Sequence, residues 1–562
     1  MKRILFLLII FSQYTFSQYT NINVVKEIRS HNKGMVVSAH PLASEAGAKI
    51  LKKGGNAFDA VIATQFALAV VYPQAGNIGG GGFLIGTTPK GDKIALDYRE
   101  TAPNKASRDM YLDSKGKANT DLSQNGRLAV GVPGSIAGMF YTHHKYGKLP
   151  MSALIQPAID LAEKGFAITD REASLLNATK ADFEKHNSHK TVFTKDTPWK
   201  QGDLLIQKEL ANTLKNIQKN GAKAFYEGKN AQLIVEEMKR GNGIITLEDL
   251  KNYKTKERKA LSFHYNGNEI VSMPMPSSGG TLLAQMLKMS SFENLEKFEQ
   301  NSPEALQVMI EAERRAYADR AEYMGDPDFV EDKTAMLISE DYLKNRWKNF
   351  SFDKATPSAE VGKITRQPKE SEQTTHISII DKYCNAVSVT TTLNGLYGSK
   401  VVVKGGGYFL NNEMDDFSVK PGVPNLYGAI GGEANSIAPN KRMLSSMTPT
   451  IVLKNGKPFM VVGTPGGTTI PTSVYQSIVN AIDFKMSPNL IINAPKFHHQ
   501  WLPEVVYIEK NFPETTIKSL EQKNYTFEKR TSIGRTEMIM IDDNGNATAV
   551  ADGRGDDSVG VE

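Results

Sequence analysis

The stretch TTHISIIDKYCNAVSVTTTL, residues 374–393, predicts the element around which this chain folds. Thr374 to Asp381 alternates and is rich in β-branched residues, and Asn385 to Leu393 repeats the pattern after a short turn. Two such segments joined by a short turn are typical of a β-hairpin, and their apolar character indicates burial. The sequence therefore predicts a buried hairpin that begins at Thr374.

The segment before the hairpin has the opposite character. Residues 351–373 (SFDKATPSAEVGKITRQPKESEQ) contain two prolines, several charges and almost no apolar periodicity. This composition is typical of an exposed connector that can be cleaved. Thr374 is thus predicted to lie where a flexible linker meets a buried strand.

A threonine at such a junction suggests one mechanism. A threonine hydroxyl is a poor nucleophile unless a base lies beside it. If the bond between Gln373 and Thr374 were cut, the freed α-amino group could be that base, because its reference pKa of about 7.7–8.0 leaves a neutral fraction near neutral pH. Cleavage would then create the active site. The alternative is that Thr374 is an ordinary strand threonine, since β-branched residues favour strands.

Motifs along the chain favour the first interpretation. The run TTHISIIDKYCNAVSVTTTLNGLYG, residues 374–398, resembles the signature of the γ-glutamyltranspeptidases, which are N-terminal-nucleophile hydrolases that cut themselves before this threonine. The resemblance continues in family order over nearly all of the mature chain, through Tyr72–Gly76, Gly79–Gly82, Asp97–Glu100, Asn411–Phe417, Lys441–Met447 and Gly463–Gly467. One departure is Cys384-Asn385 in the hairpin turn, where the family has Gly-Asn or Gly-Ser. Glycine tolerates positive φ, so either the turn type differs or Asn385 adopts that conformation.

The resemblance implies an α/β fold. It is a four-layer αββα sandwich of the N-terminal-nucleophile hydrolase type, in which two sheets packed face to face lie between helices. The resemblance also implies one intertwined catalytic domain built from two subunits, residues 18–373 and residues 374–562, that remain together as a heterodimer after self-processing. The segments themselves agree with an α/β fold, because strands are predicted on both sides of Thr374 and residues 149–326 are mainly helical in pattern. Helices are expected over residues 41–53, 57–71 and 203–220, and a strand over residues 261–273. Residues 274–280 (PMPSSGG) are expected to form a turn with a serine cap before a helix.

The first 17 residues are predicted to be a secretory signal peptide. Lys2 and Arg3 precede an apolar run from Ile4 to Phe11, and Thr15-Phe16-Ser17 offers a small-x-small cleavage site. A membrane anchor would need about 18–20 apolar residues, which neither this run nor any later segment provides. We therefore expect an exported protein, periplasmic or secreted, that is not inserted in a membrane.

Composition limits the other function classes. The chain has 562 residues, 40% of them hydrophobic, which allows a substantial core. Its net charge of +6 comes from 67 basic and 61 acidic residues spread along the chain, which indicates solubility and gives no sign of nucleic-acid binding.

Residues that commonly bind metals are few or unsuitably placed. Cys384 is the only cysteine, so it can form neither an intrachain disulfide nor a thiolate cluster. His498 and His499 are neighbours that would face opposite ways on a strand, and flanking aromatic residues indicate packing. The four glycines Gly79–Gly82 lack the order of a phosphate loop and precede a strand, so we expect close backbone packing there.

Three residues are expected at the α-carboxylate of a substrate. Arg99 ends a predicted strand, where a surface ion pair would be usual, but a guanidinium is also a natural bidentate partner of a carboxylate. The pair Ser445-Ser446 is uninformative by itself. The resemblance implies that Arg99, Ser445 and Ser446 bind the α-carboxylate of a γ-glutamyl group.

Three more residues are expected at the α-ammonium group. Glu413 and Asp416 lie three positions apart, and paired carboxylates can act as acid and base, bind a metal or hold a cation. Without a nearby histidine, and with an apolar residue between them, metal binding is disfavoured. Asn394-Gly395 by itself indicates a turn. The resemblance implies that Asn394, Glu413 and Asp416 bind the α-ammonium group.

The remaining assignments concern the reaction and access to it. The resemblance implies that Thr392, at the end of the hairpin, orients the Thr374 hydroxyl. Gly466 and Gly467 can supply the two unshielded N–H groups that an oxyanion hole needs, although a glycine turn is the alternative. Residues 421–432 (PGVPNLYGAIGG) are typical of a mobile loop over a pocket, with Tyr427 as the closing residue.

Together these features predict a self-processing γ-glutamyltranspeptidase, or glutathione hydrolase. Thr374 would form an acyl-enzyme with a γ-glutamyl donor such as glutathione and pass the glutamyl group to water, an amino acid or a peptide. The resemblance implies no metal or organic cofactor. Two alternatives are an acylase acting on glutaryl-type side chains and, in a different class, a catalytically silent periplasmic binding protein. The α-amino pocket argues against the first, and the retained Thr374, Thr392 and diglycine argue against the second.

Overall fold

Two seven-stranded antiparallel sheets form the centre of the molecule. The computed structural model describes residues 26–362, 373–423 and 431–562. The first sheet contains, in spatial order, β1 (Lys26–His31), β18 (Asn546–Ala551), β17 (Glu537–Ile541), β13 (Lys457–Gly463), β12 (Thr450–Lys454), β9 (Asn268–Ser272) and β8 (Leu261–Tyr265). The second contains β19 (Ser558–Val561), β2 (Met35–Ser38), β10 (Thr375–Ile380), β11 (Ala386–Thr392), β3 (Gly81–Thr87), β4 (Lys93–Tyr98) and β7 (Lys256–Lys259).

The predicted hairpin is β10–β11 and lies inside the second sheet. Thr375 pairs with Thr391 and Ile380 with Ala386, while β2 and β3 cover the two outer edges of the hairpin. Every residue of both strands is buried. The β-branched alternation therefore correctly predicted both the hairpin and its burial.

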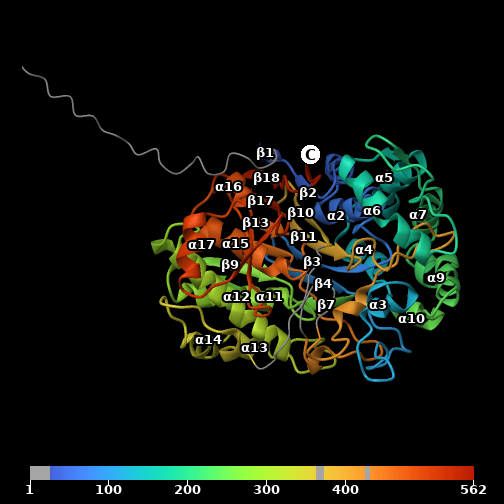
Figure 1. Cartoon of the computed structure of the whole chain (residues 1–562). Helices are drawn as coiled ribbons and strands as arrows, with labels where there is room; N and C mark the ends of the chain where they lie inside the picture. Colours follow the sequence, from blue (N-terminus) through green and yellow to red (C-terminus); the bar gives the residue numbers. More distant parts are fainter. Residues whose placement is uncertain (1–25, 363–372, 424–430) are drawn as a thin grey trace, which may run out of the picture.

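Helices cover the outer face of each sheet (Figure 1). On the second sheet lie α1 (Pro41–Lys52), α2 (Ala57–Val71) and α4 (Ser135–Tyr146), with α5 (Met151–Lys164), α6 (Asp170–His186), α7 (Lys208–Asn220) and α9 (Lys229–Lys239) outside them. On the first sheet lie α11 (Gly279–Ser291), α12 (Pro303–Tyr323), α15 (Thr469–Ile482) and α17 (Glu514–Glu521). Smaller elements are α3 (Thr120–Gln124), α8 (Lys223–Tyr226), α10 (Leu247–Asn252), α13 (Thr334–Leu337), α14 (Glu340–Trp347), α16 (Pro488–Asn493), the β5–β6 pair (Phe166–Ala167 and Leu204–Leu205) and the sheet β14–β15–β16 (Phe497–His498, Val506–Glu509 and Phe527–Arg530).

Strand alternation produces the layers. Successive side chains point to opposite faces of a sheet, so each strand contributes to two cores. In β3, Phe83 and Ile85 enter the core between the two sheets, whereas Leu84 enters the core beneath the helices. In β13, Val461 faces the other sheet and Val462 faces the helices. The architecture is the expected four-layer αββα sandwich.

Helix α2 shows how the sequence specifies one of the layers. All of its residues are buried, which matches a segment that is apolar on every side. Its start is fixed by a capping box in which Asn56 accepts from the Asp59 backbone N–H at 2.9 Å and Asp59 accepts from the Asn56 N–H at 3.1 Å. The helix packs against the β10–β11 hairpin and so supports the strand that follows Thr374.

Two local predictions need correction. The helix expected from Asp203 begins at Lys208, because Leu204–Leu205 pair with Phe166–Ala167 as a short strand. The strand expected over residues 261–273 is a hairpin, β8–β9. The serine cap expected before α11 is present, because the Ser277 hydroxyl accepts from the Gly279 N–H at 3.2 Å.

The first part of the expected linker is packed against the body of the protein. Ser358 is buried, its hydroxyl accepts from Arg314 Nη1 at 2.6 Å, and it donates to the Trp501 carbonyl at 2.7 Å. The Ala355 N–H donates to the Lys523 carbonyl at 2.7 Å. A flexible linker over all of 351–373 is therefore wrong for residues 351–362. Residues 363–372 and the predicted signal peptide, residues 1–17, lie outside the described residues.

The hairpin turn shows how the chain accommodates Cys384 at the position where the family pattern has glycine. Cys384 itself adopts φ of +66°, the conformation for which the family uses glycine. The Asp381 carboxylate holds the turn by accepting from the backbone N–H groups of Tyr383 and Asn385, both at 2.9 Å.

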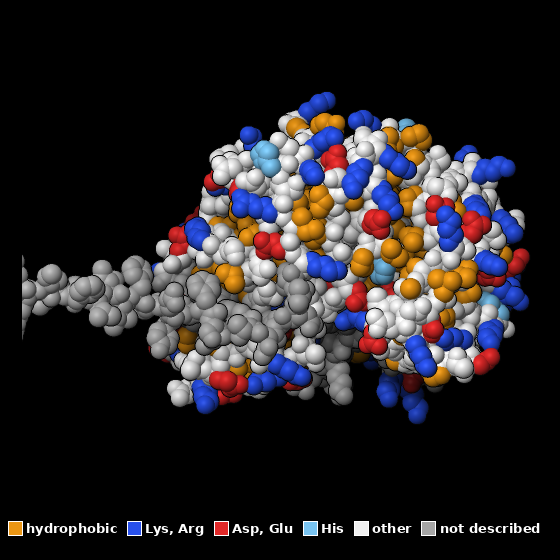
Figure 2. All heavy atoms as spheres, turned by 90° about the horizontal axis from the view of Figure 1, so that it is seen from above, with side chains coloured by type: hydrophobic (Ala, Val, Ile, Leu, Met, Phe, Trp, Pro, Cys, Tyr) orange, Lys and Arg blue, Asp and Glu red, His pale blue; other side chains and the backbone are white. Residues whose placement is uncertain are grey.

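The outer surface carries mixed charge. Figure 2 shows Lys and Arg side chains interspersed with Asp and Glu over the face seen from above. Within the described parts of the chain, no helix combines the length and apolarity needed to cross a membrane.

Candidate active site

Thr374 stands directly before β10, where the hairpin brings Thr392 close to it. The Thr392 hydroxyl accepts from the Asn394 N–H at 2.8 Å and donates to the carbonyl of Gln373 at 3.3 Å. We predicted that Thr392 orients the Thr374 hydroxyl. The contact that the structure shows is instead with the carbonyl of the Gln373–Thr374 bond, which is the bond expected to be cut.

Most of the predicted residues line one pocket, here called the first pocket. It brings together Arg99, Thr374, Thr392, Asn394, Glu413, Asp416, Ser445, Ser446 and Gly467, with four residues that we did not predict, Arg320, Met447, Thr468 and Ile470. Gly466 lines a neighbouring pocket that also contains Thr374. Tyr427 lies outside the described residues.

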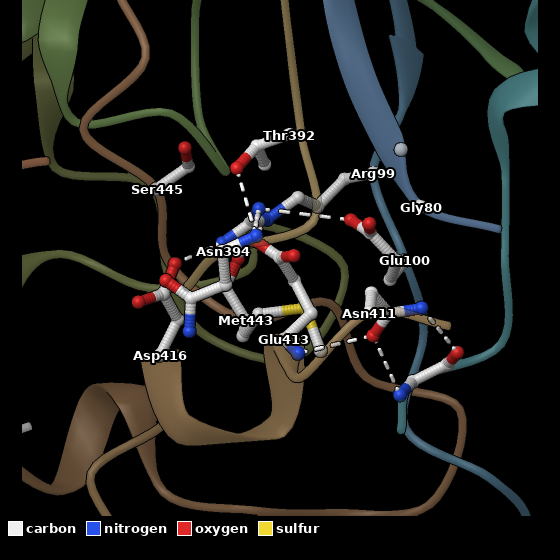
Figure 3. Close-up of polar contacts among 12 residues, drawn as sticks. Gly80, Arg99, Glu100, Thr392, Asn394, Asn411, Glu413, Asp416, Met443 and Ser445 are labelled. Atoms are coloured by element: carbon white, nitrogen blue, oxygen red, sulfur yellow. Dashed lines mark hydrogen bonds and ion pairs between the residues drawn. The ribbon is translucent and has the colours of Figure 1, made fainter. Parts of the chain in front are cut away.

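Arg99 is the centre of the charged cluster in the first pocket (Figure 3). Its guanidinium is fully buried and forms ion pairs with Glu413 and Asp416. It also donates to the backbone carbonyls of Met443 and Leu444, each at 3.3 Å. Arg99 therefore contacts both carboxylates that we assigned to the opposite end of the substrate.

A third acidic side chain lies beside this cluster. Glu100 lies 3.6 Å from Arg99 Nη1 and is fully buried. Burial raises the pKa of Glu100 to about 7, although Arg99 opposes the shift. Burial, with the added repulsion of Glu100, raises the pKa of Glu413 well above its usual value. Two of the three acidic groups around this guanidinium can thus hold protons, and a bound ammonium group would favour their ionised forms.

Asn411 fixes the position of the acidic residues (Figure 3). Its side-chain oxygen accepts from the backbone N–H groups of Gly131 at 2.9 Å and Glu413 at 3.0 Å. Its amide nitrogen donates to the carbonyls of Gly79 and Gly131, both at 2.9 Å. These four bonds join the short helix Glu413–Asp416 to the glycine run Gly79–Gly82, as close backbone packing predicts.

Arg320 is a site residue that the sequence did not reveal. It comes from the buried helix α12 and donates to the hydroxyls of Ser278 at 3.1 Å and Ser446 at 3.2 Å. Among the described residues, no carboxylate lies within 4.0 Å of its guanidinium. Because the Ser446 oxygen accepts from Arg320, its own hydrogen can be donated to a ligand. In sequence, Arg320 is one of several charged residues in a helix, and only tertiary packing distinguishes it.

The diglycine lies between two pockets at the start of α15. Gly466 and Gly467 have φ of +137° and +55°, a region that favours glycine. A Cβ atom on Gly466 would lie 2.3 Å from the Thr469 hydroxyl oxygen, so a larger residue would force Thr469 to move. The positive end of the α15 dipole adds to the positive potential here. This place suits a developing oxyanion.

The two consecutive histidines are buried. His498 Nδ1 lies 2.9 Å from the Thr472 hydroxyl, and burial lowers the pKa of His498 to about 3. Over the described ranges, no group of three or more His, Cys, Asp or Glu side chains is arranged to hold a metal ion.

A four-layer αββα sandwich with a pocket-facing threonine before a central strand defines the class of N-terminal-nucleophile hydrolases. The family model described as gamma-glutamyltranspeptidase matches residues 43–561. The chain therefore belongs to the gamma-glutamyltranspeptidase family.

Individual relatives agree with this assignment. The "Glutathione hydrolase proenzyme" of Escherichia coli (strain K12) is 45% identical over 529 residues, covering 94% of this chain and 91% of the relative. A crystal structure of Helicobacter pylori gamma-glutamyltranspeptidase is 46% identical, with a TM-score of 0.57 over 59% of this chain and 97% of that chain. A cephalosporin acylase from Bacillus halodurans is 26% identical, with a TM-score of 0.83 over 97% of this chain and 98% of that chain.

Proposed function

We propose that this protein is a self-processing γ-glutamyltranspeptidase, or glutathione hydrolase. The observation that carries the proposal is that one pocket contains both Thr374 and a buried cluster of opposite charges made by Arg99, Glu413 and Asp416. A nucleophile alone would fit many acyl substrates. The paired charges add a recognition site for a group that carries both an ammonium and a carboxylate.

The first reaction is self-cleavage. The Thr374 hydroxyl attacks the carbonyl carbon of Gln373, the C–N bond breaks, and the acyl group passes from the nitrogen to the oxygen of Thr374. Thr392 supports this step because its hydroxyl donates to the Gln373 oxygen, which becomes negatively charged. The shift leaves the α-amino group of Thr374 free, and water then hydrolyses the ester, which restores the Thr374 hydroxyl and leaves a carboxylate on Gln373. The proposed products are residues 18–373 and residues 374–562, which together form the heterodimer.

Turnover follows the same chemistry on a γ-glutamyl amide. The α-amino group of Thr374 takes the hydroxyl proton as the oxygen attacks the γ-carbonyl, and then gives a proton to the departing amine. Gly466 and Gly467 donate N–H groups to the oxyanion. Water, an amino acid or a peptide then resolves the acyl-enzyme. None of these steps in our proposal requires a metal or an organic cofactor.

Recognition uses the two ends of the charged cluster. We assign the α-carboxylate of the substrate to Arg99, Ser445 and Ser446, and the α-ammonium group to Asn394, Glu413 and Asp416. Arg99 already forms ion pairs with Glu413 and Asp416. The ammonium and carboxylate groups of a bound substrate would therefore insert between these paired side chains. Tyr427 is proposed to close the pocket, and we propose an exported, periplasmic or secreted protein.

One assay tests this function against its alternatives. Turnover of a γ-glutamyl anilide should exceed that of a glutaryl anilide, which keeps the carboxylate but lacks the α-amino group, and a dipeptide acceptor should increase release of the aniline. The acylase is the second candidate because of the cephalosporin acylase structure, and it predicts the reverse preference. A binding protein without catalysis would hydrolyse neither compound.

A further inference from the structure

We propose that Asn77 is a positioning residue for self-cleavage, because it fixes Thr392 beside the bond that is expected to be cut. This inference rests on the proposed function and names a residue that controls the rate of its first reaction. Among the described residues, those that line the first pocket do not include Asn77. Asn77 would therefore act through Thr392 and not on a substrate.

Asn77 lies in the loop between helix α2 and the glycine run Gly79–Gly82. It is only 5% exposed. An amide side chain at this depth is costly unless its polar atoms are hydrogen-bonded. The partners of the Asn77 amide therefore show what its burial achieves.

The amide nitrogen of Asn77 holds the end of strand β11. It donates to the Thr392 carbonyl at 2.9 Å and to the Thr391 hydroxyl at 3.2 Å, and also to the Ala75 carbonyl at 3.0 Å. The Thr391 oxygen can accept because its own hydrogen is donated to the Gly81 carbonyl at 2.7 Å. Two consecutive residues of β11 are thus bonded to one side chain.

The side-chain oxygen of Asn77 is held by two donors. It accepts from the Gly80 backbone N–H at 3.0 Å and from the Ser135 hydroxyl at 2.6 Å. Ser135 is the first residue of α4, and its backbone N–H donates to the Gly80 carbonyl at 3.0 Å. Because an N–H group can only donate and a carbonyl can only accept, these partners fix the orientation of the Asn77 amide.

The glycine run packs against the same carbonyl group of Thr392. A Cβ atom on Gly80 would lie 2.1 Å from the Thr392 carbonyl oxygen and 2.8 Å from Asn77 Oδ1. The backbone of Thr392 therefore has no room to move toward Gly80, and the bond from Asn77 keeps it from moving away.

The contact of Thr392 with the bond to be cut is sensitive to small shifts. The Thr392 hydroxyl donates to the Gln373 carbonyl at 3.3 Å, which is long for a hydrogen bond between two oxygens. Displacement of the Thr392 backbone by a few tenths of an ångström would break this contact. The Gln373 oxygen would then lose a donor as it becomes negatively charged. Asn77 should therefore affect the rate of the cut.

The test measures how fast the full-length precursor is converted into two chains. Precursor made by cell-free synthesis is followed on a denaturing gel, and its folding is checked by size-exclusion chromatography. Thr392→Val, which removes the hydroxyl, should slow conversion about 100-fold. Asn77→Ala should slow conversion about tenfold to 100-fold, because it misplaces the same hydroxyl. Ser135→Ala removes only one bond to Asn77 and should slow conversion less.

Double variants distinguish positioning from a general loss of stability. If Asn77 acts through the Thr392 hydroxyl, Asn77→Ala should have no further effect on the conversion rate in a Thr392→Val chain. The same holds for Ser135→Ala, which keeps the Asn77 side chain and so tests the proposal even if Asn77→Ala does not fold. Equal slowing with and without the Thr392 hydroxyl would overturn the proposal.

Asn230→Ala is the matched control. Asn230 is 2% exposed, and its amide bonds to Thr213 in α7 and to Ala224 in α8, both at 3.4 Å. Its conversion rate should equal that of the wild type. A wild-type rate in Asn77→Ala, or an equal fall in Asn230→Ala, would also overturn the proposal. Failure of the proposed function is distinct, since the wild-type chain itself would then remain uncut.

Discussion

The residues that distinguish this site are buried charges whose partners belong to the same cluster. Arg99 contacts Glu413 and Asp416, and Glu100 is a third buried acid beside it. Isolated charges at this depth would be costly, whereas paired ones can be retained for recognition. Arg320 differs because its guanidinium donates to two hydroxyl groups, those of Ser278 and Ser446. These two environments support different predictions.

Arg320 should position Ser446 for the α-carboxylate. We expect Arg320→Gln to raise KM for a γ-glutamyl anilide about tenfold with a smaller change in kcat, because the serine hydroxyl loses a charged donor. Arg320→Lys should restore part of the loss. The effects of Arg320→Gln and Ser446→Ala should be less than additive in a double-mutant cycle on kcat/KM. Strict additivity would show that Arg320 does not act through Ser446.

The raised pKa values of Glu100 and Glu413 predict proton release on binding. Below its pKa of about 7 the Glu100 carboxyl holds a proton, and a bound ammonium favours the ionised form, so affinity should rise as pH rises through about 7. The raised pKa of Glu413 acts in the same direction. The inhibition constant of L-glutamate should therefore fall between about pH 6 and about pH 8, by at most tenfold per unit for one proton. Glutarate, which lacks the ammonium group, is the control. A constant for L-glutamate that does not vary, or that rises with pH, would contradict this account.

At the level of elements, the β10–β11 hairpin determines the geometry. It places Thr374 beside Thr392, and α2 and the neighbouring strands keep it rigid. The hairpin, α1 and α2 were predictable because they depend on local alternation and apolar periodicity. Two features could not be predicted from the sequence, because each depends on groups brought together by folding. They are the contact of Thr392 with the Gln373 carbonyl and the role of Arg320. Packing of residues 351–362 was missed for the same reason, since a polar segment can be held by buried hydrogen bonds.

The turn before α15 offers a test at this scale. We expect Gly466→Ala to lower kcat about 100-fold to 1000-fold, because a Cβ atom there meets Thr469 and the positive φ disfavours alanine. Self-cleavage should continue, since Thr392 serves the Gln373 carbonyl. Gly54→Ala is the control, because Gly54 has φ of +87° with no atom within 4 Å of a Cβ. If both variants lost the same activity, backbone strain alone would be the cause.

At the scale of the whole molecule, both sheets combine strands from the two sides of the proposed cut. In the second sheet β2, β3, β4 and β7 precede Thr374, whereas β10, β11 and β19 follow it. The first sheet is mixed in the same way (Figure 1). Separation of the two pieces would expose edges and both cores. We therefore expect the cut protein to remain one particle by size-exclusion chromatography without denaturant and to give two chains in denaturant.

The most direct test of the account is the sequence at the amino terminus of the smaller piece. Purified active protein should give a fragment of about 21 kDa that begins Thr-Thr-His, at Thr374. Thr374→Ala should remain a folded, inactive, uncut chain, and Thr374→Ser, which keeps a hydroxyl, should be cut slowly and retain some activity. A fragment that begins at any other residue, or full activity in a chain that stays uncut, would contradict the assignment of Thr374 as the nucleophile.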